Sequence, residues 1–181
     1  MAEEEERKRP GLIQVYTGGA KGKTTAAWGQ ALRAVGHGWR VAVVEFLKPR
    51  TTGERVAAER LGPNLAVFGE TRPYDPCVDQ HESAELRDDS RRNFETARNL
   101  ILSGEWDMVV LDEINVVLHY GFVSRDEMLD LLGGRPDGIE MVLTGRYAPD
   151  WLVGAADLVT ETIAVKHPCE QGVQARKGIE Y

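Results

Sequence analysis

The chain has 181 residues, of which 42% are hydrophobic and 28% charged, as in an ordinary globular domain with one sizeable core. Its net charge of −7 argues against nucleic acid as the main partner but leaves room for a local basic pocket that binds phosphate. Cys77 and Cys169 form no metal-ligand pattern. With no membrane-length apolar run and no leader pattern, we expect a cytoplasmic protein that does not enter a membrane.

Residues 1–10 (MAEEEERKRP) are mostly charged and offer nothing to bury, which predicts a disordered tail. The alternative is a segment that becomes ordered over a bound ligand. Residues 11–181 form one predicted domain, in which apolar runs alternate with segments of helical periodicity. In chain order the predicted elements are a strand at 12–16, a helix at 24–35, strands at 40–46 and 65–68 separated by a helix at 54–61, a helix at 79–103, a strand at 106–111, a helix at 124–132, a strand at 139–144, a helical turn at 149–153 and a strand at 158–165.

A phosphate-binding loop is predicted between the first strand and the first helix, where residues 16–25 read YTGGAKGKTT. Glycines allow the backbone N–H groups to curl around phosphate oxygens, and the helix N-terminus favours negative charge. The Lys23 ammonium is expected to contact the phosphates, and the Thr24 hydroxyl to bind Mg²⁺ or Mn²⁺. Thr17 stands where the first glycine of the common motif would be, so the loop is one residue tighter. The predicted nucleotide-binding residues of this loop are Gly18, Gly19, Ala20, Lys21, Gly22, Lys23, Thr24 and Thr25.

The alternation of strands and helices predicts an α/β, P-loop NTPase-like fold with a mostly parallel sheet of about six strands and helices on both faces. In such a sheet, ligands bind at the carboxyl ends of the strands. Asp112-Glu113 and Arg146 follow two predicted strands directly, so we expect them to share one edge with the phosphate loop. A carboxylate there can hold the metal, and a guanidinium can bind phosphate oxygens. The alternatives are a solvated acidic loop or a helix cap for the carboxylates, and a surface ion pair for Arg146.

Several segments taken together carry a more specific signal than the phosphate loop alone. They read GLIQVYTGGAKGKTT at 11–25, LRAVGHG at 32–38, VLDEIN at 110–115, TGR at 144–146, ADLVTE at 156–161, and KH at 166–167 with GIEY at 178–181. Their combination resembles the ATP:corrinoid adenosyltransferases of the bacterial cobalamin pathway. The resemblance runs from about residue 11 to the C-terminus.

The resemblance implies an enzyme of cobalamin biosynthesis or salvage in which Co(I) of a corrinoid attacks C5′ of ATP and triphosphate leaves. It implies that Lys23, Glu113 and Arg146 serve catalysis, that Thr24 and Glu113 serve the metal, and that Arg33 contacts the nucleotide. Asp112 is a further predicted metal ligand, and a solvated helix face is the alternative for Arg33. The tightened loop fits the reversed ATP orientation of the family. A homodimer and a flavoprotein reductant are the implied partners.

The chain departs from the family pattern in two places. Gly19 and Ala20 stand where the family usually has Asn and Gly. The family's Gly-Phe-Thr-Trp stretch, whose aromatics displace the lower axial ligand of the corrinoid, aligns with Thr71-Arg72-Pro73-Tyr74. Arg72 and Tyr74 are therefore the predicted corrinoid-contacting residues. Arg72 suits a carboxylate or phosphate on a different substrate, so an ATP-binding enzyme with another acceptor and a binding module without turnover remain as alternatives.

Overall fold

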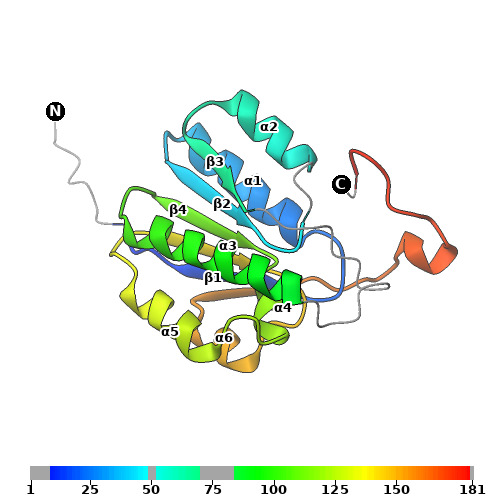
Figure 1. Cartoon of the computed structure of the whole chain (residues 1–181). Coiled ribbons are helices and arrows are strands. Elements are labelled where there is room, and N and C mark those ends of the chain that lie inside the picture. Colours follow the sequence, from blue (N-terminus) through cyan, green and yellow to red (C-terminus); the bar gives the residue numbers. More distant parts are fainter. Residues whose placement is uncertain (1–8, 49–51, 70–83, 180–181) are drawn as a thin grey trace.

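The structure, a computed structural model, describes residues 9–48, 52–69 and 84–179 (Figure 1). Six strands form one sheet in the order β3-β2-β4-β5-β1-β6, and every neighbouring pair is parallel. This confirms the predicted α/β fold. The strands are β1 (Ile13–Thr17), β2 (Val41–Glu45), β3 (Leu65–Phe68), β4 (Met108–Asp112), β5 (Glu140–Thr144) and β6 (Leu158–Glu161). The helices are α1 (Lys23–Gly36), α2 (Gly53–Leu61), α3 (Ala84–Leu102), α4 (Ile114–His119), α5 (Arg125–Gly134), α6 (Asp150–Ala155) and the 3₁₀ helix Pro168–Gln171.

Helices cover both faces of the sheet, because successive strand residues point to opposite sides. Val41 and Val43 of β2 pack in a cluster with alanines of α1 and α2, whereas Ala42 and Val44 pack in the larger cluster with α3, α4, α5 and α6. The chain crosses the sheet one way after β1 and β2 and the other way after β3, β4 and β5. Right-handed crossovers therefore place α1 and α2 on one face and the later helices on the other, as Figure 1 shows. No helix in the described part of the chain is long and apolar enough to span a membrane.

The last predicted strand, 158–165, is too long, since β6 ends at Glu161. Glu161 pairs with Thr17, the final residue of β1, and β1 then turns away into the phosphate loop. Beyond this point the described part of the chain offers no strand to pair with on that side, and Ile163 and Val165 are 74% and 93% exposed. The sequence remains apolar beyond the end of the sheet, and for this reason the predicted strand extends four residues past the end of β6.

Helix α4 was missed by the sequence analysis, and its burial explains why. Residues 114–118 are all buried, so this short helix has no polar face and shows no helical periodicity in its sequence. Residues 70–83, which carry the Thr71-Arg72-Pro73-Tyr74 segment and the predicted start of the third helix, lie outside the described residues. From Ala84 on, α3 agrees with the prediction.

The S-x-x-E pattern of residues 124–127 predicts a capping box at the start of α5, and the structure contains it. The Ser124 hydroxyl accepts a hydrogen bond from the Glu127 backbone N–H (3.3 Å), and the Glu127 carboxylate accepts one from the Ser124 backbone N–H (2.9 Å). The Ser124 hydroxyl also donates to that carboxylate, and these bonds together with Arg91 lower the pKa of Glu127 to about 2.

We expect Ser124→Ala to lower the free energy of unfolding by about 1 kcal/mol, the typical loss of an N-cap. Because the pKa of Glu127 is lower in the folded state, the ionised carboxylate stabilises the fold above the unfolded-state pKa of about 4.3. That contribution is lost as the pH falls towards 2. The difference between wild type and variant in urea unfolding should therefore shrink between pH 5 and pH 2. A constant difference over that range would contradict the role of Glu127.

Candidate functional site

The carboxyl edge of the sheet carries an unusual amount of left-handed backbone. In the described ranges three non-glycine residues have positive φ angles, namely Leu47 (56°), Glu113 (69°) and Tyr147 (62°). They follow β2, β4 and β5 respectively, at the edge where the phosphate loop follows β1. Such conformations cost free energy and occur preferentially at functional sites. The backbone alone therefore marks this edge as the candidate site.

The phosphate loop connects β1 to α1 as predicted and is fastened to the end of β6. The Thr162 N–H donates to the Thr17 carbonyl (2.8 Å), and the Ala20 N–H donates to the Thr162 carbonyl (3.3 Å). Gly18 has a φ of 103°, and a Cβ there would lie 2.3 Å from the Thr162 carbonyl oxygen. Gly22, at φ 119°, precedes α1, and no side chain caps that helix. The N–H groups of the first turn of α1 are therefore exposed to an anion in the loop.

Lys23 lies across this loop rather than in solvent, with only 7% of its surface exposed. Its ammonium donates to the carbonyl oxygens of Gly18 (2.8 Å) and Ala20 (2.7 Å). The pKa of Lys23 lies below its usual value, chiefly because the side chain is buried. The Glu113 carboxylate opposes this shift, and the Arg146 guanidinium adds to it. A bound polyanion would favour the charged ammonium, so the loop is electrostatically suited to phosphate.

Asp112 is the fully buried carboxylate of the site. One oxygen accepts hydrogen bonds from the hydroxyls of Thr24 (3.0 Å) and Thr144, and the other accepts from the Lys48 ammonium. Lys48 also donates to the Thr24 hydroxyl (3.0 Å). Although burial lowers the pKa of Lys48, Asp112 and Glu113 together raise it above its usual value. Thr24 and Asp112 thus already hold one cation between them.

This donor set fits Mg²⁺ or Mn²⁺ in the manner of a nucleotide-bound metal. A hydroxyl and a carboxylate are oxygen ligands that hard cations prefer, and a lysine ammonium marks the cation position between them. Within residues 9–48, 52–69 and 84–179, no three His, Cys, Asp or Glu side chains converge on one point. A metal here would therefore draw its remaining ligands from phosphate and water, as Mg²⁺ usually does.

Glu113 lies beside Asp112 in a tight backbone arrangement. Its N–H donates to the Thr144 hydroxyl (3.0 Å), and its left-handed φ turns the chain directly into α4. A Cβ on Gly145 would lie 3.3 Å from a Glu113 carboxylate oxygen, so this glycine leaves space for the acidic side chain. Burial raises the pKa of Glu113 and Asp112 raises it further, while Lys48, Lys23 and Arg146 oppose the shift.

The structure brings most of the predicted site residues together. Arg146 is exposed and follows β5, where its charge acts on both Lys23 and Glu113. Within the loop, Gly19, Lys21 and Thr25 are exposed and Ala20 is buried. Arg33 is not brought to this loop in the single chain. It lies exposed in the last turn of α1, about 15 Å of helix from Lys23, and its role as a nucleotide contact stays a prediction. Arg72 and Tyr74, the predicted corrinoid contacts, lie outside the described residues.

Lys48 and Asn115 belong to the site but were not predicted in it, whereas the Thr144-Gly145-Arg146 segment was expected at this edge, with no role assigned to Thr144. Lys48 follows β2, so the rule that ligands bind at strand ends could have found it. Asn115, fully buried, donates to the Gly145 carbonyl (3.0 Å) and to the Tyr16 carbonyl (3.5 Å), which ties the ends of β5 and β1 to α4. Only the packing of α4 reveals it, because that helix was not predicted.

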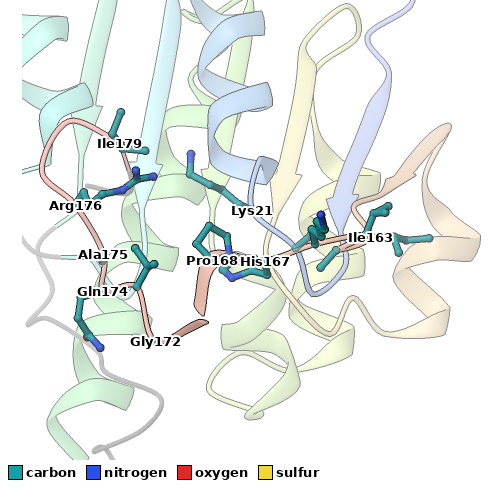
Figure 2. A pocket seen from close by; sticks show the side chains of 14 residues that line it. Lys21, Ile163, His167, Pro168, Gly172, Gln174, Ala175, Arg176 and Ile179 are labelled. Carbon is teal, nitrogen blue, oxygen red and sulfur yellow. The ribbon is translucent and has the colours of Figure 1, made fainter. Parts of the chain in front are cut away.

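A cavity of about 790 Å³ adjoins the phosphate loop on the side of the C-terminal segment. In Figure 2, Lys21 of the loop lies between Arg176 and the His167-Pro168 pair of the C-terminal segment, and all four residues line the cavity. A cavity of this volume is within the usual range for a small-molecule site.

The family model described as ATP:corrinoid adenosyltransferase BtuR/CobO/CobP matches residues 9–181. The chain belongs to this family. It is 34% identical over 178 residues to a corrinoid adenosyltransferase of Pseudomonas aeruginosa, covering 97% of this chain and 86% of the relative. It is 36% identical over 172 residues to a corrinoid adenosyltransferase of Escherichia coli K12, covering 94% and 86%. The resemblance drawn from the sequence motifs, and the prediction of an ATP:corrinoid adenosyltransferase enzyme, are thereby confirmed.

A more distant likeness concerns the fold alone. The flagellar accessory protein FlaH from Methanocaldococcus jannaschii superposes with a TM-score of 0.55 at 15% identity, covering 85% of this chain and 71% of FlaH. This agrees with the P-loop NTPase-like sheet.

Proposed function

We propose that the chain transfers the 5′-deoxyadenosyl group of Mg-ATP to the Co(I) of a corrinoid and releases triphosphate. The electron pair of Co(I) attacks C5′, the cobalt–carbon bond forms, and the C5′–oxygen bond breaks with its electron pair leaving on triphosphate. A reductant, which we expect to be a flavoprotein, must supply Co(I) beforehand. Triphosphate suits this site as a leaving group, because Lys23, Arg146 and the N-terminus of α1 lie around the phosphate loop and can bind its negative charge.

The observation that carries the proposal is the convergence of Lys23, Asp112, Glu113 and Arg146 on one sheet edge in a member of this family. When the whole triphosphate leaves, its developing negative charge needs stabilisation by groups that are already in place. Lys23 and the uncapped N-terminus of α1 supply it from the loop, and Arg146 supplies it from the end of β5. When bound, Mg²⁺ would neutralise phosphate charge, held by Thr24 and Asp112 with Glu113 beside them.

The cavity beside Lys21 supports the proposal that the adenosyl group and a corrinoid bind next to the phosphate loop. It opens from the phosphate loop towards the C-terminal segment, so a ligand anchored by its phosphates has room for its remaining part there. Val165 and Ile163, both largely exposed in the single chain, contribute apolar surface to it. An adenosyl group and part of a corrin ring are both ligands with large apolar faces, which such a lining suits.

The test is a reaction with ATP, Mg²⁺ and chemically reduced cobalamin. We expect an adenosylated corrinoid by its absorption spectrum and an equal amount of triphosphate by anion chromatography. Glu113→Gln, which keeps the shape of the side chain, should lower the rate about tenfold or more, as lost metal-site groups do. Glu59→Gln makes the same charge change on the exposed face of α2 and should react like the wild type. Absence of the cobalt–carbon product with Co(I) already supplied would refute the proposal.

The Arg72-Pro73-Tyr74 segment makes a different acceptor the second candidate. In that case ATP should bind normally, but titration with cobalamin should leave the cobalamin spectrum unchanged. A binding module without turnover would instead retain both ligands and release no triphosphate. The spectral titration and the triphosphate assay together separate the three functions.

We also propose a cytoplasmic homodimer as the working form. All four residues of β6 are exposed, and β6 is an edge strand whose outer side has no neighbour within the sheet. Leu158 and Val159 of this strand are 42% and 39% exposed, and Val153 of α6 adds a further exposed apolar side chain. Apolar surface at a sheet edge favours a covering partner, and a second copy of the chain would supply one.

A further inference from the structure

Lys48 belongs to no motif in the sequence, yet it lies in the site. It follows β2 by three residues, and the left-handed Leu47 before it marks a sharp change of chain direction at the carboxyl edge. Its side chain is 19% exposed and its ion-pair partner Asp112 is 0% exposed. The ammonium donates to both the Asp112 carboxylate and the Thr24 hydroxyl. These are two of the groups expected to hold the metal.

Lys23 and Lys48 have different roles in the site. The Lys23 ammonium donates to carbonyl oxygens of its own loop, where phosphate oxygens would replace the carbonyls as partners. The Lys48 ammonium instead lies among the oxygen ligands of a metal. A metal ion and this ammonium cannot occupy the same place between Thr24 and Asp112, because both are cations and need the same oxygens.

We propose that Lys48 holds the cation position of the phosphate site in the nucleotide-free enzyme and moves onto the triphosphate when the metal arrives with ATP. In the free enzyme, the ammonium compensates the buried Asp112 carboxylate, which would be costly to leave unpaired. Metal binding displaces it, and triphosphate oxygens then provide both new metal ligands and a new anionic partner for Lys48. Lys48 is thus a positioning residue in the free site and a phosphate contact in the loaded one.

The consequence is that metal and triphosphate bind cooperatively. Without triphosphate, the metal must displace the ammonium and finds few ligands among the described residues in return, so it binds weakly. With triphosphate present, the displaced ammonium gains a partner, and the metal gains phosphate oxygens. Because such coupling is reciprocal, metal must also strengthen triphosphate binding by the same factor. The inference rests on the proposed function only as far as a metal-bound triphosphate is the ligand, and it does not depend on the corrinoid.

The experiment measures Mn²⁺ binding by the full chain, without nucleotide, from the electron paramagnetic resonance signal of free Mn²⁺. We expect Lys48→Met to bind Mn²⁺ at least tenfold more tightly than the wild type, because the competing cation is gone. In saturating Mg²⁺, where the ammonium is expected on the phosphates, the same variant should bind inorganic tripolyphosphate at least tenfold more weakly in calorimetry. Lys48→Arg keeps a cation at this position and should suppress Mn²⁺ binding as the wild type does. Arg98→Met removes one exposed positive charge from α3 and should leave both affinities unchanged.

Should Lys48→Met not fold, Lys48→Gln keeps a neutral amide donor for Asp112 and takes its place in both measurements. Equal Mn²⁺ affinity of wild type and the folded neutral variant overturns the inference. So does failure of either protein to bind Mn²⁺ even with ATP, which would also refute the metal site. By contrast, normal Mn²⁺ behaviour with no adenosylated corrinoid refutes only the proposed function. The two failures are therefore distinguishable.

Discussion

Gly18→Ala is expected to destabilise the protein by about 2–4 kcal/mol, because it combines a strained backbone with a steric clash. Its φ of 103° is one that side-chain-bearing residues rarely adopt, and the new Cβ would lie 2.3 Å from the Thr162 carbonyl oxygen. That oxygen belongs to the backbone and cannot rotate away. For a chain of this size the melting temperature should fall by about 5–15 °C.

The neighbouring glycine provides the matched control. A Cβ on Gly19 meets nothing within 4 Å, and Gly19 has no positive φ. Gly19→Ala should therefore change the free energy of unfolding by no more than about 0.5 kcal/mol. Thermal unfolding of the two variants side by side tests the prediction. Similar melting temperatures for both would show that the contact between the phosphate loop and Thr162 is not tight in solution.

Lys23→Ala is expected to weaken the binding of ATP or tripolyphosphate by about 2 kcal/mol or more, roughly 30-fold in Kd. The physical reason is the loss of a buried ammonium that already lies over the loop, ready to exchange carbonyl partners for phosphate oxygens. Isothermal titration calorimetry with tripolyphosphate measures the loss directly. Lys23→Met, which keeps the apolar stem, separates the loss of charge from the loss of packing.

Lys21→Ala serves as the comparison within the same loop. The Lys21 side chain is exposed, so its removal should cost less than removal of Lys23. If Lys21→Ala weakens tripolyphosphate binding as much as Lys23→Ala, the binding depends on the general positive charge of the loop. If Lys23→Ala binds as tightly as the wild type, the loop is not the phosphate site.

The sequence was sufficient to predict those parts of the structure that depend on a short, well-known pattern of residues. The buried parallel strand β2 is apolar from Val41 to Val44, and the phosphate loop has its own spacing of glycine, lysine and threonine. The capping box at Ser124 and Glu127 was predicted for the same reason. In each case the signal lies within a few residues of the structure that it specifies.

What could not be predicted depends on contacts between distant segments. Lys48 reaches the site because β2 and β4 are neighbours, with Glu45 paired to Asp112. The order of strands in a sheet cannot be predicted from short segments of the sequence. The end of β6 depends on where β1 turns away, a fact about a segment more than 140 residues earlier. Helix α4 lacks a polar face because residues 114–118 are all buried against other parts of the fold. Each of these features therefore depends on the tertiary structure, which brings together segments that are distant in the sequence.

The place of β1 in the sheet also has a consequence for the order in which the protein folds. β1 comes first in the chain, yet both its neighbours, β5 and β6, come last. During synthesis the first strand therefore waits with both edges unpaired until nearly the whole chain has been made. The phosphate loop waits with it, since Thr162 supplies the bonds that hold Thr17 and Ala20. Such distant pairings slow folding, and they mean that an incomplete chain has no finished nucleotide site.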